Sequence, residues 1–201
     1  MSDEIPNPSI TTALPTADQL EQAGNVSVFT ESGDEVPLGS LIDNGKGGKA
    51  VVIFCQDFIS YLGAKVTPEV LEEHRVKLSI VGFGDWRLIK PYRETLKIPF
   101  PIYSDPSKET YTALGMTTRT LDIGEVRPEY QQGGTLGVVL SSIWRTFQIG
   151  SIGMNSGELR LLGGDFIFED GQPIYTHRMK NTRDHSPVSK LLEAAGLPYE
   201  Q

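Results

Sequence analysis

Short apolar runs alternate with amphipathic segments along the chain. The continuous apolar run Ala50–Phe54 predicts a strand that is buried on both faces of a sheet, and Val76–Val81 predicts a second buried strand. Phe100–Tyr103 and Phe166–Phe168 predict further strands, and the turn residues Glu169–Gln172 indicate that the last strand folds back as a hairpin. Buried strands that alternate with helices favour an α/β fold, with helices on both faces of one sheet.

Proline and capping residues mark the expected helix starts. Thr67–Pro68 is typical of an N-cap followed by proline at the first helical position. The pairs Asp105–Pro106 and Ser186–Pro187 predict the same arrangement for two later helices. We expect Pro91 to begin a helix, because a proline deeper inside a helix loses a backbone hydrogen bond.

The ends of the chain and one long segment set the expected organisation. Residues 1–15 are rich in Pro, Ser and Thr and predict a flexible tail, whereas residues 16–201 predict a single domain. Residues 116–158 predict a helical insertion, which carries apolar residues at helical spacing on one face: Leu136, Val139, Leu140, Ile143, Trp144 and Phe147. This apolar stripe would pack on the core, cover an apolar pocket or form the surface of a homodimer.

Composition and charge narrow the class of protein. The chain has 201 residues and a formal net charge of −8, which disfavours nucleic-acid binding. Its N-terminus lacks the pattern of a signal peptide, and the longest membrane candidate, Leu136–Trp144, is too short to span a bilayer. A single cysteine cannot form an internal disulfide and suits a reducing compartment, so we expect a cytoplasmic location.

Two segments carry a family resemblance. Ile98–Met116 and Leu162–His185 resemble the corresponding segments of the AhpC/TSA antioxidant family of peroxiredoxin-like proteins. The resemblance extends over about residues 25–197. It implies a thioredoxin-like fold with a central mixed sheet flanked by helices. The closing hairpin and helix also favour this sheet over a dinucleotide-binding one.

The resemblance implies a reactive cysteine after the first buried strand, often within a Cys-x-x-Cys loop that leads into a helix. A helix N-terminus stabilises a thiolate there. In this chain Cys55 follows Phe54 directly, so the loop is shortened and Cys55 matches the second, resolving position. Cys55 is either the catalytic thiol or a small buried apolar residue. The place of the arginine that peroxiredoxins use near the thiolate is taken by Gly163.

Other residues are candidates for substrate binding. Trp86 and Arg87 follow the second buried strand and would line a pocket beside Cys55, or simply pack. Gly163 and Gly164 permit a close approach of the backbone. The last candidates are His177, Arg178 and Asp184.

The polar segment that holds His177, Arg178 and Asp184 has two interpretations. Together with Arg183 and His185, these side chains would form a polar rim that orients substrate or supplies acid–base chemistry. Alternatively they belong to a loop network in which Asp184 or Ser186 caps the last helix. The histidines lack a third ligand at a diagnostic spacing, so no metal is expected, and no cofactor is indicated.

Three functions follow from these residues. In the first, Cys55 attacks a peroxide, and an external thiol such as glutathione or thioredoxin regenerates it. In the second, the chain is a redox-silent protein that binds a small molecule or a partner. In the third, His177 and Asp184 perform non-redox chemistry on an apolar substrate in the same cleft.

Overall fold

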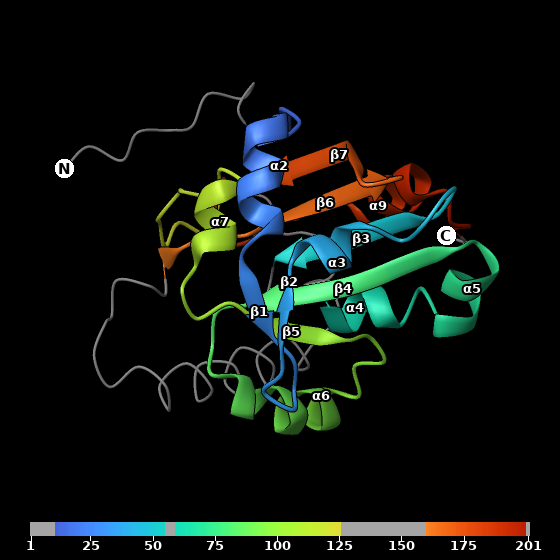
Figure 1. Ribbon diagram of the computed structural model, residues 1–201, viewed down its shortest axis with the longest axis horizontal. Coiled ribbons are helices and arrows are strands. Elements are labelled where there is room, and N and C mark those ends of the chain that lie inside the picture. Colours follow the sequence, from blue (N-terminus) through green and yellow to red (C-terminus); the bar gives the residue numbers. More distant parts are fainter. Residues whose placement is uncertain (1–10, 55–58, 126–159, 200–201) are drawn as a thin grey trace.

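One mixed sheet forms the centre of the molecule (Figure 1). The computed structural model describes residues 11–54, 59–125 and 160–199. The strands follow the order β2-β1-β5-β4-β3-β6-β7 across the sheet. Their bounds are β1 Ser27–Phe29, β2 Glu35–Pro37, β3 Lys49–Phe54, β4 Val76–Gly82, β5 Ile102–Ser104, β6 Gly164–Glu169 and β7 Gln172–Arg178. Neighbouring strands are parallel between β3, β4 and β5 and antiparallel at both edges of the sheet.

Helices cover both faces of this sheet. On one face lie α2 (Ala17–Gly24), α3 (Gly39–Ile42) and α7 (Glu109–Ala113). The opposite face is covered by the helices α4 (Ile59–Gly63), α5 (Pro68–Glu73), α6 (Ile89–Leu96), which follows a 3-10 turn at Trp86–Leu88, and α9 (Val188–Ala195). The predicted α/β architecture with two helical layers is confirmed.

Strand β3 connects the two halves of the core. Its side chains alternate: Val51 and Ile53 face the α9 side, whereas Val52 and Phe54 face the α2 side. Each residue of the run Ala50–Phe54 is at most 2% exposed. A strand that pairs on both edges and is covered on both faces must be apolar throughout, which is why the continuous run predicts it.

The closing hairpin also follows its prediction. Strands β6 and β7 are joined by Asp170 and Gly171, whose φ angles are 50° and 75°. Two consecutive positive φ angles match the twist of a tight antiparallel hairpin, and Asp-Gly tolerates them. The hairpin places β7 at the edge of the sheet.

Two proline predictions are wrong in detail. Pro91 is the third residue of α6, which begins at Ile89. A proline is tolerated there because the first N–H groups of a helix have no partner within the helix. Likewise α7 begins at Glu109 and not at Pro106. The carboxylate of Asp105 nevertheless accepts hydrogen bonds from the backbone N–H groups of Lys108 and Thr110, at 2.8 and 2.9 Å.

The predicted cap of the last helix is also corrected. Pro187 is the N-cap of α9, and no side chain caps this end. The hydroxyl of Ser186 accepts a hydrogen bond from the Tyr175 hydroxyl instead, at 2.9 Å. Asp184 accepts a hydrogen bond from the N–H of Lys180, at 2.9 Å, so it stabilises the loop before the helix.

Two predicted segments fall partly or wholly outside the described residues. The apolar stripe of the helical insertion lies within residues 126–159, which the structure does not describe. Of the expected N-terminal tail, residues 11–15 are described; Thr11 is 3% exposed, and the carbonyl of Ala13 accepts a hydrogen bond from Arg178. The domain boundary at residue 15, the single domain and the homodimer stay predictions.

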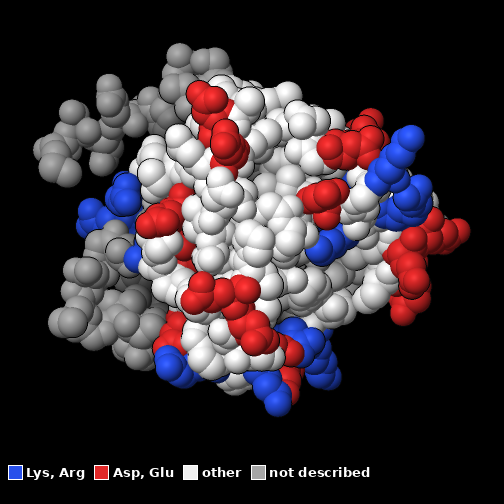
Figure 2. All heavy atoms as spheres, viewed as in Figure 1, with Lys and Arg blue, Asp and Glu red and all other residues white. Residues whose placement is uncertain are grey.

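Charges on the visible face of the molecule are interspersed. Figure 2 shows Asp and Glu in separate groups, with Lys and Arg toward the margins and a broad uncharged area in the middle. Among the described residues of this face, Lys and Arg form no extended basic surface of the kind that a phosphate backbone attracts.

Candidate functional site

The end of β3 directly precedes the cysteine that the sequence analysis singles out. Phe54 is the last residue of this strand and is fully buried. Cys55 follows it in the sequence and lies outside the described residues. The site is therefore built from the residues that lie next to Ile53 and Phe54 in the structure.

A glycine pair lies directly beside Phe54. Gly164 is the cross-strand partner of Phe54, and a Cβ atom built on Gly163 would lie 1.5 Å from the Phe54 carbonyl oxygen. A Cβ atom on Gly164 would lie 2.6 Å from the carbonyl oxygen of His177. Both positions require glycine, because the three backbones at this corner of the sheet are too close for a side chain.

A buried carboxylate lies one residue further along β6. Asp165 pairs with Ile53 on one side and with His177 on the other, and it is 0% exposed. Its Oδ2 accepts a hydrogen bond from the backbone N–H of Ser186, at 2.9 Å. Its Oδ1 lies 3.5 Å from Nδ1 of His185, whose side chain is 3% exposed.

The surroundings keep Asp165 ionised. Burial disfavours the charged form, but the hydrogen bond and positive charge of His185, the N–H of Ser186 and the charge of His177 outweigh it. The net effect is a lowered pKa of Asp165. Burial also raises the pKa of the nearby Tyr175 phenol, and the charge of Asp165 adds to this effect. A buried anion thus lies one row from the end of β3.

His177 and Asp184 form the outer part of the same cluster. Nε2 of His177 lies 2.7 Å from the backbone oxygen of Asp184 and 3.4 Å from its Oδ1. The two side chains are 16% and 26% exposed. Burial raises the pKa of Asp184, but the hydrogen bond and charge of His177 outweigh it, so the pKa is lowered on balance.

Arg178 points to the other face of the sheet. It is 6% exposed, its Nε donates to the carbonyl oxygen of Leu114 at 2.6 Å, and its Nη1 donates to that of Ala13 at 2.7 Å. The guanidinium also lies over the ring of Phe166, 5.5 Å from the centroid. Burial lowers the pKa of Arg178. These contacts tie the N-terminal segment and the end of α7 to β7.

Trp86 and Arg87 lie in the segment between β4 and α6. The ring of Trp86 packs against the β1–β2 turn, where a Cβ atom on Gly33 would come within 2.7 Å of it. Arg87 pairs with Asp85 at 3.0 Å, lies over the Trp86 ring and has a 68% exposed side chain. Trp86 also packs against the apolar cluster on the α9 side of the sheet. Gly163, Gly164, His177 and Asp184, in contrast, come together at the corner formed by β6 and β7.

Sequence reasoning missed Asp165. It stands next to the apolar run Phe166–Phe168, and a charged residue at the start of a strand buried on both faces is itself a signal. A buried carboxylate requires partners, and the nearby His177 and His185 were available as candidates.

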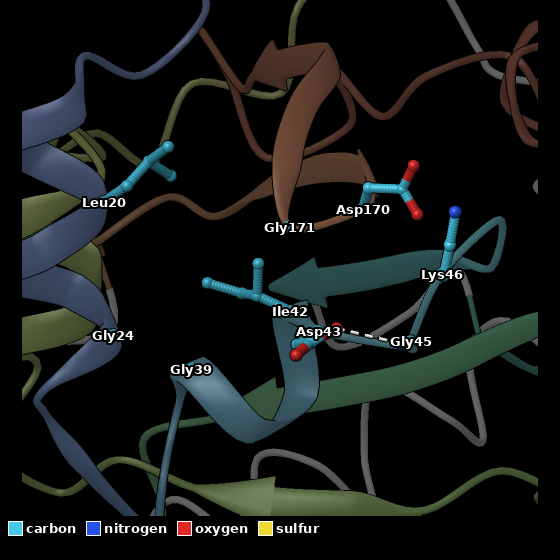
Figure 3. Close-up of a pocket in the computed structure, with 9 residues that line it drawn as sticks. All are labelled: Leu20, Gly24, Gly39, Ile42, Asp43, Gly45, Lys46, Asp170 and Gly171. Atoms are coloured by element: carbon cyan, nitrogen blue, oxygen red, sulfur yellow. Dashed lines mark hydrogen bonds between the residues drawn. The ribbon is translucent and has the colours of Figure 1, made fainter.

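A hollow of about 450 Å³ lies at the opposite end of β3 (Figure 3). Leu20 and Ile42 point into it from α2 and α3, and Asp43, Lys46 and Asp170 lie at one end. None of the predicted site residues that the structure describes lines this hollow. Gly45 and Lys46, which line it, precede the start of β3, whereas Phe54 is the last residue of this strand.

The described part of the chain comprises residues 11–54, 59–125 and 160–199. In these ranges no group of three or more His, Cys, Asp or Glu side chains is placed to hold a metal ion. None of the helices in these ranges combines the length and hydropathy that a membrane-spanning segment requires.

Comparison with known proteins identifies the family. Residues 64–181, more than half of the chain, match the family model described as AhpC/TSA antioxidant enzyme. The chain belongs to this family. Among curated AhpC/TSA relatives, human Peroxiredoxin-like 2C is 28% identical over 180 residues, which cover 86% of this chain and 78% of the relative. Its mouse counterpart is 29% identical over 178 residues, which cover 85% and 77%.

Solved structures confirm the fold expected of this AhpC/TSA protein. The bacterioferritin comigratory protein of Xanthomonas campestris matches with a TM-score of 0.57 at 12% identity and covers 92% of this chain and 95% of its own. Peroxiredoxin 6 of Arenicola marina matches with a TM-score of 0.56 at 15% identity and covers 92% and 72%. The fold is therefore thioredoxin-like, as predicted.

Proposed function

We propose that the chain is a thiol-dependent peroxidase that uses Cys55 as its catalytic thiol and an external thiol as its reductant. Membership of the AhpC/TSA family and the thioredoxin-like fold support an antioxidant of the thiol type. The observation that carries the finer proposal is that the only cysteine follows directly on the last residue of β3. The resemblance implies the redox cysteine after this first buried strand.

The chemistry needs one thiol and two co-substrates. The Cys55 thiolate attacks one peroxide oxygen; an S–O bond forms, the O–O bond breaks, and the leaving oxygen takes a proton to become an alcohol or water. The sulfur is oxidised by two electrons to a sulfenic acid. A first external thiol then forms a mixed disulfide and releases water, and a second external thiol releases the Cys55 thiol and leaves as a disulfide.

The neighbours suggest which peroxides to test. The bacterioferritin comigratory protein of Xanthomonas campestris, which shares the fold, reduces alkyl peroxides. We therefore expect an alkyl hydroperoxide to be a substrate, with hydrogen peroxide as the comparison. Glutathione and thioredoxin are the two external reductants to compare, because the chain has no second cysteine to form an internal disulfide.

The decisive experiment compares the wild-type chain with Cys55→Ser. Peroxide consumption is followed with tert-butyl hydroperoxide or hydrogen peroxide and with each reductant in turn. We expect wild-type turnover, and in mass spectra one added oxygen that a sulfenic-acid reagent traps. Cys55→Ser abolishes both. Equal consumption by the two proteins, or a Cys55 thiol that alkylating reagents reach only after denaturation, would contradict the proposal and favour a redox-silent binding protein.

A further inference from the structure

The hollow at the start of β3 has an apolar side and a charged end (Figure 3). Its volume of about 450 Å³ falls within the range of about 300–1,000 Å³ that is typical of small-molecule pockets. Leu20, which is half-buried, and Ile42, which is 7% exposed, supply the apolar side. A Cβ atom on Gly45 or Gly171 would meet nothing within 4 Å, so the space beside these two lining residues is open.

Hydrogen bonds fix the loop 43–48, which carries most of the charged end. The side-chain amide of Asn44 donates to the carbonyl oxygens of Lys49 and Arg75, at 3.0 and 2.9 Å. The guanidinium of Arg75 in turn donates to the carbonyl oxygen of Lys46, at 2.6 Å. The loop is thus held against β3 and the α5–β4 turn. A ligand that binds to a fixed loop does not have to order it, which removes one of the main costs of binding.

The charged side chains at this end have unused bonding capacity. Oδ1 of Asp43 accepts a hydrogen bond from the N–H of Gly45 at 2.8 Å, and Oδ1 of Asp170 accepts one from the N–H of Gly47 at 2.6 Å. Among the described residues, no group donates to the Oδ2 atom of either carboxylate, and none pairs with the ammonium of Lys46. Two negative groups and one positive group are therefore available to a ligand.

This combination of charges selects a ligand that carries both signs. A ligand that is only an anion is attracted by Lys46 but repelled by Asp43 and Asp170. A ligand that is only a cation is attracted by the two carboxylates but repelled by Lys46. A molecule with adjacent ammonium and carboxylate groups avoids both repulsions, and an apolar substituent on it would face Leu20 and Ile42.

We propose that this hollow binds an α-amino acid with an apolar side chain, such as leucine. The carboxylates of Asp43 and Asp170 attract its α-ammonium, Lys46 attracts its α-carboxylate, and its side chain packs on Leu20 and Ile42. Exposed ion pairs contribute little, so we expect a Kd on the order of 1 mM. The inference does not depend on the proposed thiol chemistry, because none of the lining residues takes part in it.

The test is a titration of the full chain, followed by the backbone amide signals of Gly45, Gly47 and Gly171 in nitrogen-15 spectra. L-leucine carries both charges, leucinamide keeps only the ammonium, and N-acetyl-leucine keeps only the carboxylate. Leucinamide also represents the N-terminal residue of a peptide. Glycine carries both charges but has no side chain. We expect L-leucine to bind about tenfold more tightly than glycine and about fivefold more tightly than either single-charge derivative.

Substitutions assign each charge to its part of the ligand. Lys46→Gln is expected to weaken the binding of L-leucine about fivefold and to leave leucinamide unaffected or tighter. Asp43→Asn is expected to weaken L-leucine and leucinamide but not N-acetyl-leucine, and its amide oxygen still accepts the hydrogen bond from Gly45. Lys90→Gln is the matched control, because Lys90 is exposed on α6 and does not line the hollow. Damage to the fold would weaken all four ligands alike.

Two kinds of result overturn the inference. In the first, the three glycine amides do not respond to L-leucine at concentrations up to about 20 mM. In the second, the hollow does not recognise both charges: a single-charge derivative binds as tightly as L-leucine, or Lys46→Gln and Asp43→Asn bind it as the wild type does. Peroxide consumption by these two variants is expected to equal that of the wild type, so the proposed peroxidase activity is tested separately.

Discussion

Gly163→Ala tests how closely the backbone packs beside the last residue of β3. The added Cβ atom would lie 1.5 Å from the carbonyl oxygen of Phe54. Ordinary contact needs about 3.5 Å, so the two chains must separate by about 2 Å. The clash is with backbone and not with a side chain that can rotate away, and Phe54 is fully buried.

The cost of this separation comes from two sources. Overpacking in a well-packed interior costs about 1–3 kcal/mol. The movement also strains the pairing of Phe54 with Gly164 and the hydrogen bond from Met179 N–H to the Gly163 carbonyl, 3.1 Å long. Each lost hydrogen bond adds about 1 kcal/mol. We expect a loss of about 3 kcal/mol, which corresponds to a fall in Tm of about 6–12 °C for a chain of this size.

Urea denaturation followed by circular dichroism measures this loss, with Gly84→Ala as the matched control. Gly84 has an ordinary φ, and a Cβ atom there would meet nothing within 4 Å. Its replacement is expected to be neutral, or stabilising by about 0.5 kcal/mol through the unfolded state. If Gly163→Ala is as stable as Gly84→Ala, the backbones beside Phe54 are not as close as the structure has them. Close packing would then not explain the glycine at position 163.

Four further results are expected. Asp165→Ala lowers the free energy of unfolding by about 3–5 kcal/mol in urea denaturation, because the groups that face this buried carboxylate lose their partner. The pKa of Asp165 is lowered in the folded protein, so the stabilisation from its ionised form is lost as the pH falls through the folded pKa. The pKa of His177 is raised, so the stabilisation from its protonated form is lost as the pH rises through the folded pKa. In urea denaturation over a pH series, Asp165→Asn removes the first pH dependence and His177→Gln removes the second. Arg178→Met costs about 3 kcal/mol and speeds proteolysis near residue 13, because the charged bonds to two carbonyls are lost. Asp105→Ala removes the acceptor of four hydrogen bonds before α7 and costs about 2–3 kcal/mol by thermal denaturation.

The sheet could be predicted because its signals are local. A run such as Ala50–Phe54 has no polar residue, and only a strand covered on both faces accommodates it. The Asp170–Gly171 turn needs two positive φ angles, and the pair Asp-Gly is typical of such a turn. Thr67 caps α5 and Pro68 begins it, as the pair predicts.

Helix starts were harder where the capping group acts over a longer distance. Asp105 does bind the free N–H groups before α7, but Lys108, at φ 61°, is the N-cap, and the helix begins three residues after Pro106. The Ser186 hydroxyl bonds to Tyr175, a residue 11 positions earlier in the sequence, and does not cap α9. Side-chain partners that come from another strand leave no trace in the local pattern.

The site could be predicted only in part. The glycine pair, His177 and Asp184 were candidates from the sequence, and they meet at one corner of the sheet. Their role in substrate binding stays a prediction. Asp165 was missed, because its burial depends on the β6–β7 pairing and on a loop that folds back over it. The roles of Trp86 and Arg87 stay predictions, and so does the shortened loop before Cys55.

Successive side chains of β7 point to opposite faces of the sheet, which explains why His177 and Arg178 have different surroundings. Gly164 pairs with Arg178 and Asp165 pairs with His177, so the two side chains emerge on opposite faces of the sheet. Arg178 meets backbone carbonyls and Phe166 on the α2 side and holds the chain together. His177 meets two carboxylates on the α9 side. A shift of the β6–β7 register by one residue would exchange these positions. The close backbone approach that requires Gly163 and Gly164 lies at the same corner, so it also restricts this register and thereby which residue of β7 faces each layer.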